Sequence, residues 1–166
     1  MSTKPSGLLD IRSGTDLTRP ATPYQKLRQL EALIPLVFEE LSIDSMTSHD
    51  FCGGIYRRQF VMQKDSIVVS KLHKEENWFL LFSGEISIYS GDGTTIRRKA
   101  PYMAKTPANT KRSVYAHEDS VMFTFHCNPD NETDMAKLES RYIMPEVKPT
   151  LPSWFADRAR KLLENT

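Results

Sequence analysis

The sequence SKLHKEENWFLLFSGEISIYS, residues 70–90, says more about the fold than any other part of this chain. It runs from a polar string through an apolar segment at 78–82 into the Ser83-Gly84 pair, and then into an alternating segment at 85–89. A short apolar run bounded by turn residues is typical of a buried strand, and alternation is typical of a strand with one solvated face. The stretch therefore predicts two strands joined by a tight turn at Gly84.

Further short strands are expected on both sides of this stretch. The expected strands are 55–62, 67–72, 78–82, 85–89, 94–98, 102–104, 112–116 and 120–126. They recur at intervals of about eight to twelve residues with no helical pattern between them, which indicates an antiparallel sandwich or barrel. The fold class is therefore predicted to be mainly β, an antiparallel β-barrel with a kinked N-terminal helix and a C-terminal helix.

Helical patterns flank this β-region. Thr22-Pro23-Tyr24-Gln25 matches a helix start, with a hydroxyl at the N-cap, Pro at the first helical position and Gln three residues after the cap. Apolar residues at spacings of three and four continue to Leu41, and Pro35 within this stretch predicts a kink or two shorter helices. A short helix is expected at 132–139, and Ser153 can cap a last helix.

The length of 166 residues fits one domain with flanking segments. We divide the chain into an extended arm (1–21), an N-terminal helical segment (22–42), a β-barrel (49–127) and a C-terminal extension with a terminal helix (128–166). The 22 Lys and Arg residues nearly balance the 21 Asp and Glu residues, which gives no overall bias toward nucleic acid or anionic membranes. No segment has the pattern of a signal peptide or the length of a membrane span.

The two cysteines, Cys52 and Cys127, adjoin apolar strand sequence. Free thiols in such a context are commonly buried, so we expect two reduced, buried cysteines and an intracellular protein.

The region from about His49 to His126 resembles the cupin superfamily, whose members are small double-stranded β-helix barrels of jelly-roll type. The resemblance rests on the polar string at 71–77, on the turn between strands at 80–88, and on the segment 107–112. Three narrower strings, at 51–58, 71–74 and 110–119, resemble the uncharacterised single-domain cupins of tailed bacteriophages. The resemblance implies a jelly-roll barrel over somewhat under half of the chain.

Metal-binding cupins carry three histidines and a glutamate at set positions around the barrel mouth. The resemblance places these positions at Lys71, His73, Asn77 and Arg112, so one imidazole remains of the four ligands. Lys and Arg are cations, which repel a divalent ion and offer it no donor. We therefore expect no cofactor and no standard metal site.

The barrel mouth is nevertheless the candidate ligand site. On an extended strand Lys71 and His73 project to the same side, which in a cupin is the interior. The candidate residues are Tyr56, Arg58, Lys71, His73, Asn77, Arg112 and His126. Either these groups hold an anionic or hydroxylated ligand, or they only fill the mouth and satisfy one another and neighbouring carboxylates. A non-standard metal site is a third alternative, if the strands bring His49 and His126 to His73.

The sequence favours a binding or structural role over catalysis. It contains no Gly-rich phosphate loop, no Cys-x-x-Cys and no His-Glu-x-x-His, and His73 is the only candidate general base. Neighbouring basic residues such as Arg57 and Arg58 alternate between strand faces, which argues against a nucleic-acid groove.

We predict a non-enzymatic cupin-fold module that acts as a phage assembly, virion-associated or accessory structural protein through homo- or hetero-oligomeric contacts. Its expected partners are copies of itself or other assembly subunits, with no membrane, and its expected location is the bacterial host cytoplasm or the virion. The alternative is a small-molecule module that binds a sugar or anionic metabolite, or an isomerase- or oxygenase-type cupin enzyme, using the mouth around His73.

Overall fold

The computed structural model describes residues 20–37 and 43–151, together with residues 153, 157 and 161. Its helices are α1 (Pro23–Val37), the 3-10 helix η1 (Asp44–Met46) and α2 (Met135–Tyr142). Its strands are β1 (Thr47–Cys52), β2 (Ile55–Met62), β3 (Ile67–Val69), β4 (Asn77–Ser83), β5 (Glu85–Ser90), β6 (Thr95–Lys99), β7 (Tyr102–Thr106), β8 (Arg112–Ala116) and β9 (Ser120–Cys127). None of the helices in these residues is long and apolar enough to cross a membrane.

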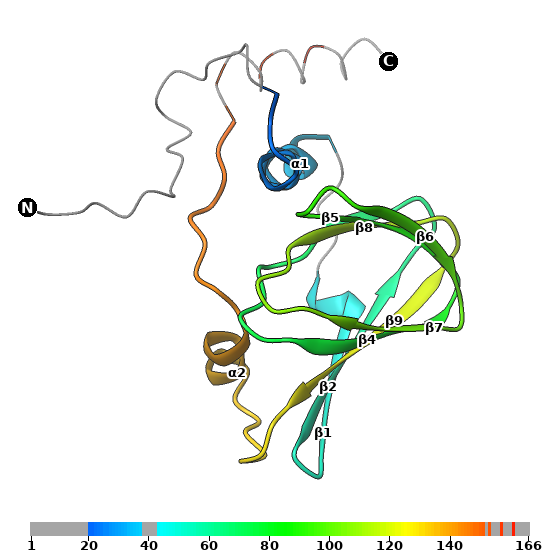
Figure 1. Cartoon of the computed structure of the whole chain (residues 1–166), viewed down its shortest axis with the longest axis vertical. Helices are drawn as coiled ribbons and strands as arrows, with labels where there is room; N and C mark the ends of the chain where they lie inside the picture. Colours follow the sequence, from blue (N-terminus) through cyan, green and yellow to red (C-terminus); the bar gives the residue numbers. More distant parts are fainter. Residues whose placement is uncertain (1–19, 38–42, 152, 154–156, 158–160, 162–166) are drawn as a thin grey trace, which may run out of the picture.

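The strands form two sheets that face each other (Figure 1). The five-stranded sheet has the order β1-β2-β9-β4-β7, the four-stranded sheet has the order β3-β8-β5-β6, and every strand pair is antiparallel. The predicted fold class is therefore confirmed. One strand, β1, was not expected from the sequence, and β3 ends at Val69, three residues before the end of the strand predicted there.

The interior of the sandwich is divided into an apolar end and a polar end. Alternate residues point inward along each strand, because successive side chains in a strand lie on opposite faces. At the apolar end these residues form a continuous buried cluster of Met62, Phe79, Leu81, Ile86, Ile88, Val114, Ala116 and Met122. Toward the other end the same faces carry polar groups: β2 continues to Arg58, β4 to Asn77 and β8 to Arg112.

The turn at Gly84 connects the two sheets at the apolar end. β4 and β5, which Gly84 joins, pair with different partners and belong to different sheets, so the turn is a crossover rather than a hairpin. Gly84 has a φ of +86°, a backbone conformation that residues with a Cβ rarely adopt. A Cβ at this position would lie 2.2 Å from Ser120 Oγ and 2.5 Å from the carbonyl oxygen of Asp119. The crossover therefore requires glycine.

The helix α1 begins at the residues that the sequence predicted. The Thr22 amide donates to Gln25 Oε1 at 2.8 Å, and the Gln25 amide donates to Thr22 Oγ1 at 3.2 Å, so the capping box is formed. α1 is one helix that includes Pro35 in its last turn, where the expected kink or break was placed. It lies beside β3 and the four-stranded sheet (Figure 1).

The helix α2 starts three residues later than predicted. Asp134 is its N-cap, and its carboxylate accepts hydrogen bonds from the amides of Ala136 and Lys137. Its buried residues Leu138 and Tyr142 pack against Tyr56 of β2. The expected arm and terminal helix fall almost entirely outside the described residues.

The cysteines differ from expectation in one respect. Cys52 and Cys127 are free thiols, but both are exposed, not buried. They end β1 and β9, where both strands flank Ile55 at the open tip of the five-stranded sheet. This tip extends beyond the sandwich, so its side chains have no second sheet to cover them (Figure 1).

Candidate functional site

The polar end of the sandwich gathers most of the candidate residues. Tyr56 and Arg58 come from β2, Asn77 from β4, Arg112 from β8 and His126 from β9. Tyr56, Asn77 and His126 are buried, whereas the two arginines are partly buried. His73 lies in the loop before β4 and is held there by a bridge to Ile143 after α2.

Lys71 does not join this group. Because β3 ends at Val69, residues 70–76 form a loop, and strand alternation does not bring Lys71 and His73 to one side. The Lys71 side chain is 58% exposed and forms an ion pair with Glu139 of α2.

The aromatic rings and imidazoles at the polar end are stacked. The ring centroids of His73 and His126 are 5.8 Å apart with an interplanar angle of 10°, and His126 lies 5.5 Å from Tyr56 and 4.7 Å from Tyr142. His49 Nδ1 lies 2.8 Å from the Tyr56 hydroxyl, on the far side of that ring. The three histidines therefore form one row with Tyr56 between His49 and His126.

Burial keeps both interior imidazoles neutral. It lowers the pKa of His73 and the pKa of His126 to about 4, and the positive charge of Arg58 adds to the effect on both. Arg112 also lowers the pKa of His73. Burial lowers the pKa of Arg112 itself to about 10, so its guanidinium remains charged at neutral pH.

The two interior guanidiniums have no acidic partner. Among the residues that the structure describes, neither Arg58 nor Arg112 forms an ion pair with a carboxylate. Arg112 contacts the Thr106 hydroxyl and lies over the Phe79 ring, 5.2 Å from its centroid. The polar end is therefore positively charged and only partly neutralised by hydrogen bonds and ring contacts.

The residues do not fit the metal ion that the cupin resemblance implies. The four corresponding positions hold an exposed ion-paired lysine, one imidazole, an amide and a guanidinium, and the two cations cannot donate to a metal. The nearly parallel rings of His73 and His126 have centroids 5.8 Å apart, and His49 is separated from them by Tyr56. Across residues 20–37 and 43–151, no three His, Cys, Asp or Glu side chains are placed to hold a metal.

A cavity of about 310 Å³ opens next to Arg112. It lies between β5 and β6 of one sheet and β7 of the other, with Tyr24 of α1 on its rim. Its polar lining includes Arg112 and Thr106, and its apolar lining includes Ile88 and Tyr102. The cavity therefore gives access to one of the unpaired guanidiniums.

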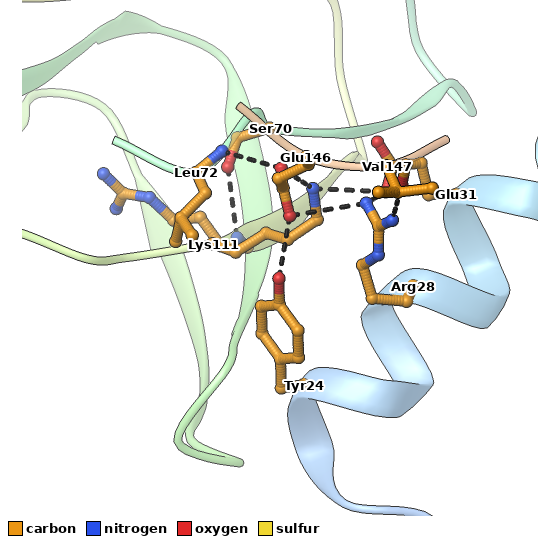
Figure 2. A network of polar contacts seen from close by, with 9 residues as sticks. Tyr24, Arg28, Glu31, Ser70, Leu72, Lys111, Glu146 and Val147 are labelled. Carbon is orange, nitrogen blue, oxygen red and sulfur yellow. Dashed lines mark hydrogen bonds and ion pairs between the residues drawn. The ribbon is translucent and has the colours of Figure 1, made fainter. Parts of the chain in front are cut away.

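A second cation, Lys111, has two carboxylate partners that the sequence did not reveal. Its side chain is completely buried, and its Nζ lies 2.8 Å from Glu146 and 3.2 Å from Glu31. Figure 2 shows Glu146 at the centre of this network, where its carboxylate also accepts hydrogen bonds from Tyr24 and Arg28. These contacts tie α1 and the segment after α2 to β8, and no sequence pattern links residues so far apart in the chain.

The Glu146 network shifts the titration of its members. Burial raises the pKa of Glu146, but hydrogen bonds from Lys111 and Tyr24 outweigh it and hold that pKa below its usual value. Burial and the bond to Glu146 raise the pKa of Tyr24 to about 12. Glu146 is therefore a carboxylate and Tyr24 a neutral donor at neutral pH.

Acidification from pH 7 to pH 5 is expected to destabilise the fold through His73 and His126. The unfolded imidazoles bind protons near pH 6.5, whereas the pKa values of about 4 keep the folded ones neutral. Below pH 6.5 the unfolded state therefore binds more protons than the folded state, and the free energy of unfolding falls as the pH falls toward 4. The loss is at most about 1.4 kcal/mol per pH unit for each imidazole. Urea unfolding at pH 7 and pH 5 measures this loss. A His73→Gln/His126→Gln variant that loses as much stability as the wild type would contradict the assignment.

The strand order and the divided interior define the class of protein. Two antiparallel sheets in the orders given above, in which consecutive strands change sheets at every connection except β1–β2 and β5–β6, form a double-stranded β-helix of jelly-roll type. The chain therefore has the jelly-roll fold that the cupin resemblance implied, with a polar mouth at one end and a closed apolar core at the other.

No protein-family model matches the chain, and no curated protein matches it in sequence. Similar solved structures include an uncharacterised double-stranded β-helix protein from Klebsiella pneumoniae, 12% identical, with a TM-score of 0.44 over 57% of this chain and 93% of that chain. The cupin domain of Schizosaccharomyces pombe Cnp3 is 17% identical, with a TM-score of 0.43 over 57% and 69%. The plu4264 protein from Photorhabdus luminescens is 14% identical, with a TM-score of 0.45 over 62% and 98%.

Proposed function

We propose that this chain is a non-enzymatic cupin-fold module that assembles with copies of itself through the outer face of its five-stranded sheet. The observation that carries this proposal is a patch of exposed and partly exposed apolar side chains on that face. We call it the outer patch, and it consists of Val61, Trp78, Leu80, Phe82, Met103, Val121, Phe123 and Phe125.

The outer patch is continuous across four strands. In register, Phe125 of β9 pairs with Trp78 of β4, and Phe123 of β9 pairs with Leu80, which in turn pairs with Met103 of β7. These residues alternate with the inward-facing ones, so they all lie on the solvent side. Trp78 is 50% exposed and Phe82 is 64% exposed.

The size of the outer patch supports an interface. An aromatic side chain buries about 150–250 Å² when covered, so Trp78 and Phe82 each leave on the order of 100 Å² in solvent. With its other members, the patch reaches the several hundred Å² that mark interaction sites on soluble proteins. A standard interface covers about 800 Å² on each partner, with an apolar centre and a polar rim, and the patch and its charged borders have this arrangement.

The charges at the borders support a second copy as the partner. The β1–β2 border carries the Asp50–Arg57 ion pair, and the β7 border carries the Glu76–Lys105 ion pair at 2.6 Å. A two-fold axis parallel to the strands sets one border of each copy against the opposite border of the other. Each border then meets a border that also carries one acid and one base, so neither contact sets like charges alone against each other.

The interior gives little support to a catalytic role. With a pKa of about 4, His73 is a weak general base at neutral pH, where an efficient base has a pKa near the working pH.

The resemblance to single-domain cupins of tailed phages suggests the specific role, an assembly or virion-associated accessory protein. Mass spectrometry of purified virions tests that role, because an accessory protein made only in the host cytoplasm would be absent from them.

A Trp78→Glu/Phe82→Glu variant is expected to be monomeric where the wild type is dimeric. Two carboxylates in the centre of the outer patch would be desolvated without partners in the assembled state, but they remain solvated in the monomer. Size-exclusion chromatography with light scattering at about 50 µM protein gives the mass of each form. Thr95→Glu, an exposed change on the outer face of the four-stranded sheet, is the matched control and should stay dimeric. A wild-type protein that is monomeric at this concentration would overturn the proposal.

A further inference from the structure

Two neighbouring cations, the buried Lys111 just before β8 and the partly buried Arg112 at its first position, have different surroundings. Lys111 is surrounded by two carboxylates, at 2.8 and 3.2 Å. Its neighbour Arg112 points to the opposite side, into the sandwich, and receives only the Thr106 hydroxyl and the Phe79 ring. A buried ion without an opposite charge costs several kcal/mol, so such an ion is normally paired. Arg112 therefore lacks the negatively charged partner that a cation in the interior normally has.

The charged groups around Arg112 increase this deficit. Arg58 on the facing β2 strand is a second cation, and its Nε is buried with no hydrogen-bond partner. His73 and His126 are neutral and contribute no countercharge, since their pKa values lie near 4. The acidic side chain on the cavity wall, Asp92, accepts hydrogen bonds from the amide and hydroxyl of Thr94.

Unused hydrogen-bonding capacity lies beside these cations. Asn77 is 4% exposed, and both its Nδ2 and its Oδ1 are buried without a partner. A buried amide left unpaired costs about 1–3 kcal/mol, so native proteins rarely contain one. Asn77 pairs in register with Thr106, whose hydroxyl contacts Arg112 and which lines the cavity. Thr106 and Arg112 line the cavity, and the unpaired amide of Asn77 belongs to the residue paired with Thr106 on the neighbouring strand.

We propose that the polar end of the sandwich binds a small molecule through its oxyanion, a carboxylate or a phosphate, held by Arg112 and Arg58 with Asn77 as a further donor. The planar guanidinium presents paired donors that match two oxygens of such a group, and the charge of the anion supplies the missing countercharge. A neutral sugar would satisfy Asn77 but would leave both cations uncompensated. This site is independent of the outer patch, which lies on the opposite face of the five-stranded sheet.

The cavity sets the size and character of the ligand. At about 310 Å³ it is at the lower end of the range of small-molecule sites, so the ligand is small. Ile88, Ile96 and Tyr102 form its apolar wall. The ligand is therefore expected to carry its oxyanion toward Arg112 and a short apolar or aromatic part toward this wall.

The test measures thermal unfolding of the full chain with sodium phosphate, sodium benzoate or sodium chloride, matched in ionic strength. We expect phosphate, benzoate or both to raise the Tm by several degrees over chloride, because a ligand that binds only the folded state stabilises it. Phosphate alone points to a phosphate ester, and benzoate alone to an aromatic carboxylate. No stabilisation by either anion at 50 mM would overturn the proposal.

Variants locate the effect. Arg112→Met is expected to raise the Tm of the protein in chloride, because it removes an uncompensated buried charge, and to weaken anion binding at least tenfold by titration calorimetry. Arg97→Met removes an arginine that is exposed and paired with Glu85 on the same sheet, and it should bind anions like the wild type. Asn77→Leu, which keeps the branched shape of the side chain but removes its polar atoms, is a second test, and binding is expected to weaken about tenfold. Anion binding unchanged in Arg112→Met and Asn77→Leu would also overturn the proposal.

Discussion

Gly84→Ala is expected to destabilise the fold by about 3 kcal/mol or more, enough to leave much of a marginally stable domain unfolded at 37 °C. The added methyl would lie 2.2 Å from Ser120 Oγ, 2.5 Å from the Asp119 carbonyl oxygen and 2.8 Å from Ser120 Cα. Two of these three atoms belong to backbone, which cannot move aside as a side chain end can. Relief of the clash would therefore require the crossover between the two sheets to shift.

Gly53→Ala is the control that measures the cost of a positive φ without a steric clash. Gly53 also has a positive φ, +56°, but its Cβ would meet no atom within 4 Å. Its cost should be limited to the conformational penalty of about 1–2 kcal/mol. Urea unfolding of both variants gives the difference. Equal losses of stability would show that the close approach at Gly84 relaxes, contrary to the expectation.

Glu146→Ala is expected to destabilise the protein by on the order of 3 kcal/mol, because it removes the nearer partner of a buried cation. The substitution leaves Lys111 with Glu31 alone and takes an acceptor from Tyr24 and from the Leu72 amide. Since α1 contributes Tyr24, Arg28 and Glu31 to this network, α1 should also detach more readily (Figure 2).

Two measurements check the Glu146 prediction. Urea unfolding gives the change in stability, and hydrogen exchange of the α1 amides should become faster relative to those of β4 and β9. Glu75→Ala, at an exposed position in the loop before β4, is the control, with an expected change below about 0.5 kcal/mol. A Glu146→Ala protein as stable as the control would mean that Glu31 alone suffices for Lys111.

The strands from β2 to β9 could be predicted because their inward-facing residues are largely apolar. The alternation in 55–62 places Tyr56, Arg58, Phe60 and Met62 on one face, and the structure turns this face inward. The strand β1 has no such signal: its Ser48, His49 and Asp50 are exposed, because β1 lies at the edge of the sheet. A strand without a buried face has no period to recognise.

The site was predictable to the extent that the strands fix side-chain direction. Inward positions on β2, β4, β8 and β9 could be derived from alternation, whereas the position of Lys71 could not, since it follows the end of β3 in a loop. The network around Lys111 joins residues from α1, β8 and the segment after α2. Its members are related only by tertiary packing, which local sequence does not encode.

The exposed cysteines give the sheet tip a chemical property of its own. Cys52 and Cys127 are both cross-strand neighbours of Ile55, so two strand spacings, about 10 Å, separate their backbones. A disulfide requires Cα atoms within about 7 Å, so the folded tip keeps the two thiols apart. A Cys52–Cys127 disulfide within one molecule could thus form only after β2 had separated from β1 and β9. Short bifunctional maleimides, in contrast, can bridge the intact tip and hold these three strands together without any engineered residue.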